Sequence, residues 1–394
     1  MIESGTNWLY LPDRIWESIL CNLNKRSLLN ASESCKKIND LLSLSQLLIK
    51  KLSLQINIPH SINYTKNERA REKIYLRSFR NLEMMKECLK MSGRKYNSII
   101  IRNLKDVKNP IAKYNYNAIF DILKQFAGSV KQIKFVYTSL QDEIFIKIMQ
   151  TLKNLKVLKF ERFCWIENNE AVTEIVKPDI VPLIHEIYFK EVDNIFFQKL
   201  LWFDNIIILD VEHFHWIYIW DFEKFLLLQK NLKVLNCMQL SFGVMFKSDK
   251  LAKVKFSLDE LSLNSHWWVN MKNAMNFFKT QTNLKKVTLY LRYFWWFSND
   301  DDLELEMCYN ELLIHLFSNN LQLKTVFISI SEEFGLDIKD YSFLEGIVNL
   351  SVENLTFNLD PFQNGIEFVN TFSNLFPNVK CVTHLVNEDY NRMG

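Results

Sequence analysis

Few side chains in this chain have the type and spacing that catalysis or metal binding requires. His213-x-His215 would place two imidazoles on one face of a strand near Asp210, but zinc needs a third or fourth ligand, which the spacing does not mark. No glycine-rich phosphate loop, GxSxG or HExxH motif occurs in the sequence. The sequence therefore predicts no catalytic residue, metal site or cofactor, and a protein that is not an enzyme.

Aromatic clusters are stronger candidates for contacts with a partner, because tryptophan and tyrosine are enriched at binding hot spots. Four clusters recur at the same point of a repeating pattern: Phe163-Cys164-Trp165, residues 214–220, His266-Trp267-Trp268 and Tyr293-Phe294-Trp295-Trp296-Phe297. The alternative is that these rings fill space inside turns. As candidate substrate-binding residues from these clusters we select Trp267, Trp268, Trp295 and Trp296.

The pattern that positions these clusters is LxxLxL, in which apolar residues stand at the first, fourth and sixth places. It recurs eleven times between Tyr96 and His384, at intervals of 22 to 39 residues, three of which in succession are 26. Its alternating end predicts a short strand, and residues between the strands follow helical spacing. The sequence thus predicts an α/β fold in which short parallel strands and helices stack into a curved solenoid. The pattern resembles leucine-rich repeats.

The repeats depart from that family in one respect. The Asn or Cys that usually stands three residues after the third apolar position is replaced in seven repeats, by Thr138, Phe163, Val192, Phe214, Leu240, His266 and Arg292. That residue normally satisfies backbone groups in the turn after the strand. Its loss predicts uneven turns and irregular repeats.

Polar residues that alternate with the apolar ones should face the inner surface of the predicted arc. Taken along the whole chain, this face is mixed in charge, which favours a protein segment over nucleic acid as its partner. The candidate substrate-binding residues on this face are Lys159, Glu161, Tyr188, Lys190, Asp210 and Glu212.

The N-terminal stretch 9–54 reads as three short helices with too few apolar residues to form a core alone. Leu11-Pro12 precedes the first helix, and Asn24 can cap a second helix that carries residues as far as Ile38. A third helix is expected to start at Ser43 or Ser45. A small apolar bundle of this kind usually needs another surface to cover it.

This stretch resembles the F-box, by which substrate receptors dock onto the Skp adaptor of cullin-based ubiquitin ligases. The resemblance rests on Leu11, Pro12, Ile15, Ile19, Leu20, Leu23, Leu28 and the run Ser34-Cys35-Lys36-Lys37-Ile38. It implies an adaptor-binding surface made of Leu11, Pro12, Ile15, Trp16, Ile19, Leu23 and Leu28.

The predicted organisation is an F-box over 1–54, a helical connector over 55–95 and about eleven irregular leucine-rich repeats over 96–394. Such a pairing is similar to F-box/leucine-rich-repeat proteins. The resemblance implies a substrate-recognition subunit that binds the Skp adaptor, and through it cullin and RING subunits, and binds an unknown protein substrate with its repeats. Two alternatives remain at this point: an interaction scaffold that does not direct degradation, and a small-molecule sensor.

Composition limits the classes of partner and the cellular compartment that we expect for the protein. The 394 residues carry a net charge of only +3, so the chain has no bulk attraction to nucleic acid or to membranes. No signal peptide or apolar run of membrane-spanning length is visible, and the seven cysteines lack paired spacing. We therefore expect a reducing compartment, cytoplasmic or nuclear.

Overall fold

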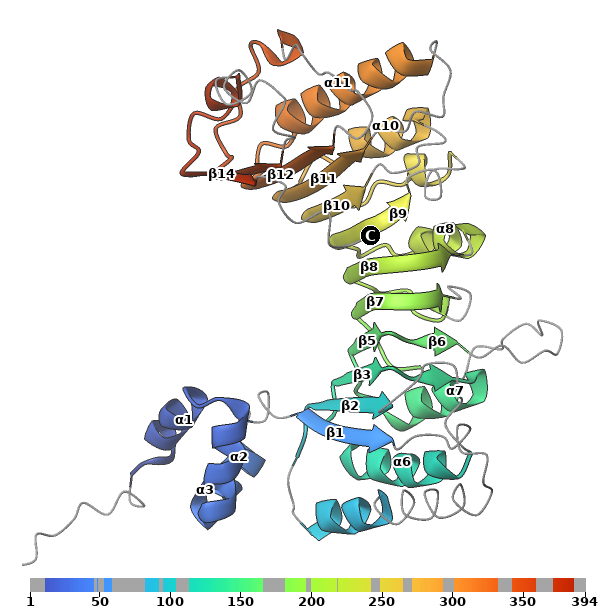
Figure 1. The fold of residues 1–394 in the computed structure, drawn as a ribbon, viewed down its shortest axis with the longest axis vertical. Helices are drawn as coiled ribbons and strands as arrows, with labels where there is room; N and C mark the ends of the chain where they lie inside the picture. Colours follow the sequence, from blue (N-terminus) through green and yellow to red (C-terminus); the bar gives the residue numbers. More distant parts are fainter. Residues whose placement is uncertain are drawn as a thin grey trace, which may run out of the picture. The chain divides into compact units, whose positions relative to one another are not determined.

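The computed structural model divides the chain into two compact units, residues 1–184 and 185–394 (Figure 1). It describes residues 11–45, 48, 53–58, 82–91, 95–103, 113–165, 181–195, 200–217, 219–241, 249–264, 271–292, 301–331, 342–358 and 371–385. The fold is mixed α/β. Twelve described strands run parallel to their neighbours in chain order, four in the first unit and eight in the second.

The first unit begins with three helices, α1 (Asp13–Cys21), α2 (Lys25–Ser34) and α3 (Lys36–Leu44), which we call the N-terminal bundle. The Asn24 side chain accepts a hydrogen bond from Ser27 N at 2.9 Å, so the predicted cap of the second helix is confirmed. The prediction that this helix reaches Ile38 is wrong. Cys35 is extended, with φ −142° and ψ 119°, and α3 starts directly after it. The predicted helix start at Ser45 is confirmed separately, because Leu48 is helical and its backbone N donates to Ser45 Oγ at 3.4 Å.

The parallel strands of the first unit are β1 (Ser53–Ile58), β2 (Ser98–Asn103), β3 (Gln132–Val136) and β5 (Val157–Glu161). Helices α6 (Lys113–Phe126) and α7 (Asp142–Thr151) connect them, together with a helix over 82–91. The sequence missed β1, which lies across the end of the predicted F-box and the start of the predicted connector. Its first motif position would be Lys51, a charged residue that breaks the LxxLxL pattern.

The second unit repeats the same arrangement with eight strands. These are β7 (Glu186–Ile195), β8 (Ile208–Ile217), β9 (Val234–Ser241), β10 (Glu260–Asn264), β11 (Lys286–Arg292), β12 (Thr325–Ser331), β13 (Asn354–Asn358) and β14 (Cys381–Leu385). The longer helices between them are α8 (Ile219–Leu228), α10 (Met271–Thr280) and α11 (Asp301–Asn319). Short helical turns lie at η3 (Leu251–Lys253), η4 (Ser342–Leu344) and 371–375.

Every one of the eleven LxxLxL motifs coincides with one of these strands, which confirms that the motifs mark strands of an α/β fold. The motif side chains form the core on the helix-covered side of the sheet, where Phe160 of β5 packs against Phe145 of α7 with ring centroids 6.4 Å apart. Val382 of the last strand is 49% exposed, because no further described strand follows β14. The other face of the strands stays partly open, and we call it the open face.

The turns are more regular than the missing Asn or Cys predicted. Tyr137, Arg162 and Glu191 each stand two residues after the third motif position, and all three adopt positive φ angles of 52°, 48° and 49°. After the first two of these turns, the short strands β4 (Ser139–Leu140) and β6 (Cys164–Trp165) pair with each other. Local backbone pairing therefore replaces the missing side-chain ladder in the first unit.

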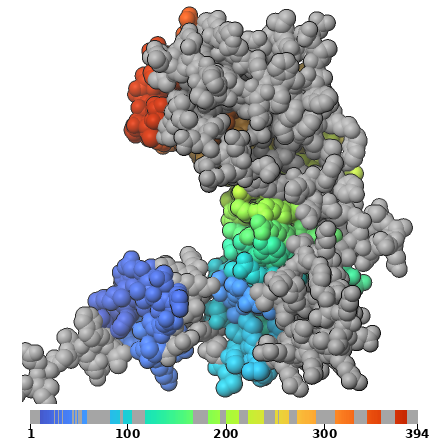
Figure 2. Space-filling model, in the orientation of Figure 1, coloured from blue at the N-terminus to red at the C-terminus, as the bar shows by residue number. Residues whose placement is uncertain are grey.

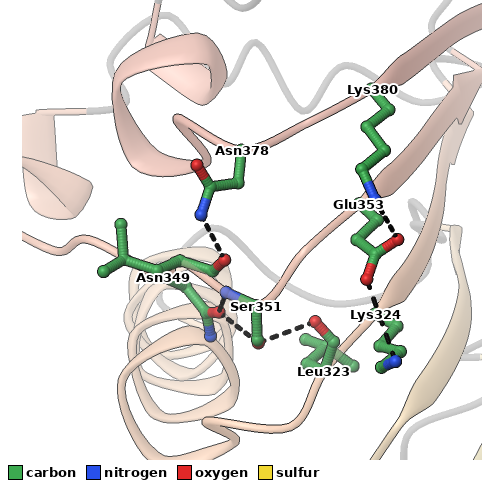
Figure 3. A network of polar contacts seen from close by, with 8 residues as sticks. Leu323, Lys324, Asn349, Ser351, Glu353, Asn378 and Lys380 are labelled. Carbon is green, nitrogen blue, oxygen red and sulfur yellow. Dashed lines mark hydrogen bonds and ion pairs between the residues drawn. The ribbon is translucent and has the colours of Figure 1, made fainter.

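In the second unit, buried amide side chains supply a ladder at a different point of the repeat. Gln229, Gln281, Asn320 and Asn349 each stand three residues before a motif and are nearly fully buried. Asn349 Nδ2 donates to Phe317 O at 2.8 Å and to Asn320 O at 3.1 Å. Its Oδ1 accepts from Ser351 N at 3.0 Å (Figure 3). Gln229, Asn320 and Asn349 join a helix end to the neighbouring repeat, so they satisfy backbone groups that would otherwise be buried without partners. Gln281 instead donates to Phe277 O and Thr280 Oγ1 of the preceding helix α10.

Candidate functional site

The N-terminal bundle, drawn in blue in Figure 2, carries exposed apolar residues on α1. Pro12 is the N-cap residue of this helix, and its carbonyl accepts hydrogen bonds from Ile15 N at 2.9 Å and Trp16 N at 3.2 Å. Ile15 and Ile19 are 46% and 40% exposed, whereas Leu20 on the same helix is 1% exposed. Residues four apart share a helix face, so the two isoleucines form one outward patch, which we call the α1 patch.

The other predicted adaptor-binding residues differ in how far their side chains are buried. Leu11, Trp16 and Leu23 are half-buried beside the α1 patch, and Trp16 Nε1 has no hydrogen-bond partner among the described residues. Leu28 is fully buried, so the prediction that it lies on a binding surface is wrong. It fills the core between the short helices instead.

A lysine of α3 fixes the start of α1. Lys37 Nζ donates to Leu11 O at 3.0 Å and lies 3.6 Å from Asp13 Oδ1. This contact joins the end of the bundle to its beginning, across 26 positions of sequence. It holds the Leu11-Pro12 segment against the bundle and so sets where the α1 patch begins.

On the open face of the first unit lie the predicted substrate-binding residues Lys159 and Glu161, both on β5. Glu161 forms an ion pair with Lys134 of the neighbouring strand β3. Lys134 and Lys159 are direct partners in the register of the two strands. Sequence reasoning selected Lys159 and Glu161 but not Lys134, nor Arg102 on β2, which also faces the open side.

In the second unit, Tyr188, Lys190, Asp210 and Glu212 do come together, as predicted. The register of β7 and β8 places Tyr188 opposite Asp210 and Lys190 opposite Glu212, and Lys190 Nζ lies 3.2 Å from Glu212 Oε1. Burial raises the pKa of the Tyr188 phenol above its ordinary value, and the nearby carboxylates of Glu186 and Asp210 raise it further. The tyrosine therefore stays a neutral donor, and it donates to Glu186 Oε2 at 2.9 Å.

On the next strand of the sheet, β9, Asn236 stands opposite Asp210. Its Nδ2 donates to Asp210 Oδ1 at 2.8 Å. The sequence marked Asn236 as facing inward but gave no signal that it would hold the aspartate. This polar row can accept hydrogen bonds from a partner.

The aromatic clusters are core filler where the structure describes them. Phe163 is buried against Phe160 with ring centroids 4.9 Å apart, and Trp165 packs edge-on against Phe145 at 5.0 Å. For this first cluster the turn-filling alternative is confirmed. Trp267, Trp268, Trp295 and Trp296 lie outside the described residues.

The histidine pair considered for metal binding, His213 and His215, lies on β8, but its side chains are outside the described part of the structure. Among the side chains that are described, no group of three or more His, Cys, Asp or Glu is placed to hold a metal ion. No described helix combines the length and apolar content needed to cross a membrane.

Comparison with known proteins assigns no relative. No protein-family model matches the chain, and no curated protein matches its sequence.

Proposed function

We propose that this protein is the substrate-recognition subunit of a Skp–cullin–F-box ubiquitin ligase, in which the N-terminal bundle binds the Skp adaptor and the repeats bind a protein substrate. The observation that carries the proposal is the α1 patch. Ile15 and Ile19 are exposed directly after the Leu11-Pro12 start, at the positions where the resemblance to the F-box places the adaptor.

The energy available at this surface supports docking. Fully burying an exposed isoleucine side chain contributes about 1.5–3 kcal/mol. Because Ile15 and Ile19 are 46% and 40% exposed, covering both would contribute about 1.3–2.6 kcal/mol before the costs of association. Half-buried Leu11, Trp16 and Leu23 would add area around them. A hydrophobic patch with a rim that is already folded is the kind of surface that a partner helix covers.

The repeats supply the second half of the proposal. In each unit the strands leave one face of the sheet partly open, and that face carries charged and polar side chains held by cross-strand contacts. Stacked repeats use such surfaces to bind extended protein segments. Residues of this open face, not the buried Phe163 and Trp165, are the ones that we assign to substrate.

The test is affinity purification of the full-length protein from cells, with mass spectrometry of what accompanies it. We expect a Skp adaptor, a cullin and a RING subunit, together with substrates that accumulate when the proteasome is inhibited. Ile15→Asp with Ile19→Asp should remove the ligase subunits and retain the substrates. Met84→Asp is the matched control, because Met84 is also an exposed apolar residue of the first unit.

Two results would contradict this function. If ligase subunits are absent from the wild-type purification, the adaptor-binding role is excluded. If the adaptor is present but no bound protein accumulates on proteasome inhibition, the chain is a scaffold that does not direct degradation.

A further inference from the structure

Exposed apolar residues stand in the turns that lead into β12 and β13. Leu321 and Leu350 each lie two residues before the first motif position of their repeat, and they are 72% and 63% exposed. Val348, two residues before Leu350, is 56% exposed. We call these three residues the apolar ridge. Three other repeats of the second unit carry exposed polar residues at the place of the leucines, Asp204, Lys230 and Thr282, so the turn itself does not need a leucine.

Contacts beneath the apolar ridge hold its two leucines next to each other. Asn349 Nδ2 donates to Asn320 O at 3.1 Å, which joins the residues that directly precede the two leucines. Thr325 and Asn354, each four residues after its leucine, are partners in the register of β12 and β13, on strands about 4.8 Å apart. The apolar ridge is therefore already formed before a partner binds, which lowers the entropic cost of binding.

Backbone groups beside the apolar ridge are already used inside the protein. Three carbonyl groups of these turns accept hydrogen bonds from side chains of the following repeat: Asn320 O from Asn349, Leu323 O from Ser351 and Leu350 O from Asn378. An added strand binds through free backbone groups of the edge that it joins. We therefore expect a partner to bind this surface through its side chains.

A charged group borders the apolar ridge where the strands begin. Glu353 lies between two lysines, with Oε1 3.8 Å from Lys324 Nζ and Oε2 2.7 Å from Lys380 Nζ (Figure 3). Both lysine side chains are exposed, and among the described residues neither contacts another carboxylate. Two cations therefore share one anion, so a partner with a negative charge at this place complements the surface.

The size of the apolar ridge limits the kind of partner. A stable interface covers about 800 Å² on each side, far more than three aliphatic side chains present, so the ridge alone does not support a dimer of this chain. A single amphipathic helix suits it better. Such a helix satisfies its backbone groups internally and presents apolar side chains three and four residues apart on one face.

We infer that the apolar ridge binds a short amphipathic helix of a partner protein, and that acidic residues beside the apolar face of that helix contact Lys324 and Lys380. The surface is separate from the α1 patch and from the open face of the strands. It adds a third contact to the two that the proposed function uses, and it does not depend on that function.

Fluorescence anisotropy with the full-length protein tests the inference. The probe is a labelled helical peptide that carries leucines three and four residues apart on one face and glutamates beside them. Leu321→Ser with Leu350→Ser should weaken its binding at least about tenfold, because the ridge loses most of its apolar area. The matched control is Leu183→Ser, which should leave binding unchanged, since Leu183 is 55% exposed but belongs to the first unit.

The charged group gives two predictions of opposite sign. Glu353→Gln leaves both lysines to the peptide, which should then bind about two- to fivefold more tightly. Lys324→Gln with Lys380→Gln should weaken binding by a similar factor and reduce its dependence on salt. A role of Glu353 in folding alone would not tighten binding. Circular dichroism and thermal melting check that each variant is folded.

Any of four peptide results would overturn the inference: no binding by the wild-type protein, equal binding by the Leu321→Ser/Leu350→Ser variant, equal binding of a twin peptide with Lys in place of Glu, or weaker binding by Glu353→Gln. A wild-type dimer in sedimentation that the leucine substitutions dissociate would also overturn it, because the ridge would then be a contact between copies of this chain. Adaptor binding, measured on the same variants, should stay unchanged, so failure of this inference leaves the proposed function standing.

Discussion

The amide ladder of the second unit makes a quantitative prediction about stability. Asn349→Ala removes four hydrogen bonds: two donated to Phe317 O and Asn320 O, and two accepted from Ser351 N and Ser351 Oγ. The alanine leaves at least two backbone groups, Phe317 O and Ser351 N, without that partner. An unsatisfied buried group costs about 1–3 kcal/mol, so we expect a local loss of about 3 kcal/mol.

Hydrogen exchange read by mass spectrometry measures this loss locally, which matters because a chain of two units need not unfold in one step. A loss of about 3 kcal/mol corresponds to amide exchange about a hundredfold faster in peptides that cover the end of α11 and the start of β13. The control is Asn378→Ala. That side chain is exposed and makes one bond, from Nδ2 to Leu350 O at 2.8 Å, so its loss should cost less than about 1 kcal/mol.

The reasoning is refuted if Asn349→Ala accelerates exchange by less than about tenfold, or by no more than Asn378→Ala does. Either result would mean that water or a shifted backbone satisfies the groups that Asn349 contacts. The ladder would then be incidental to the stability of the repeats.

Three further predictions follow from buried and paired groups. Phe163→Ala should lower the free energy of unfolding by about 3–5 kcal/mol, measured in a thermal or chemical melt. A decrease below about 1 kcal/mol would mean that Phe163 is not packed in the core. The Lys380 side chain lowers the pKa of the Glu353 carboxyl through a hydrogen bond. The pair therefore stabilises the fold at pH values above the pKa that Glu353 has in the unfolded chain. This stabilisation is lost as the pH falls through the lower pKa that Glu353 has in the folded protein. The melting difference between wild type and Lys380→Gln should therefore shrink below about pH 4, and a constant difference would contradict the pairing. Burial raises the pKa of the Cys237 thiol, so a thiol reagent should modify exposed Cys381 first and Cys237 only on unfolding, and early Cys237 labelling would show an open core.

The strands of the repeats could be predicted from sequence because their signal is local. A buried strand needs apolar residues at alternate positions, and each of the eleven motifs supplies them. β1 was missed because its first motif position is Lys51, although Leu54 and Ile56 are buried as in the other strands. The division of the second helix at Cys35 was missed because the apolar spacing continues through it to Ile38.

The candidate site was harder to predict because it depends on pairing between strands. The sequence gives the signs of Lys134, Lys159 and Glu161 but not which of them stand opposite one another. Only the register shows that Lys134 stands opposite Lys159, whereas Lys190 stands opposite Glu212. The amide ladder does have a sequence signal, because an Asn or Gln stands three residues before four of the motifs. The signal can be interpreted only from the structure, in which Asn349 donates to Asn320 O of the preceding repeat.

The central claim is that the α1 patch binds a Skp adaptor, and isothermal titration of purified adaptor into the full-length protein tests it most directly. We predict one adaptor bound per chain, with binding abolished by Ile15→Asp with Ile19→Asp and unchanged by Met84→Asp. Binding should also be abolished by Leu11→Ala with Pro12→Ala, which changes the residues at the start of α1. Absence of binding by the wild-type protein, or equal binding by the Ile15→Asp/Ile19→Asp variant, would contradict the account.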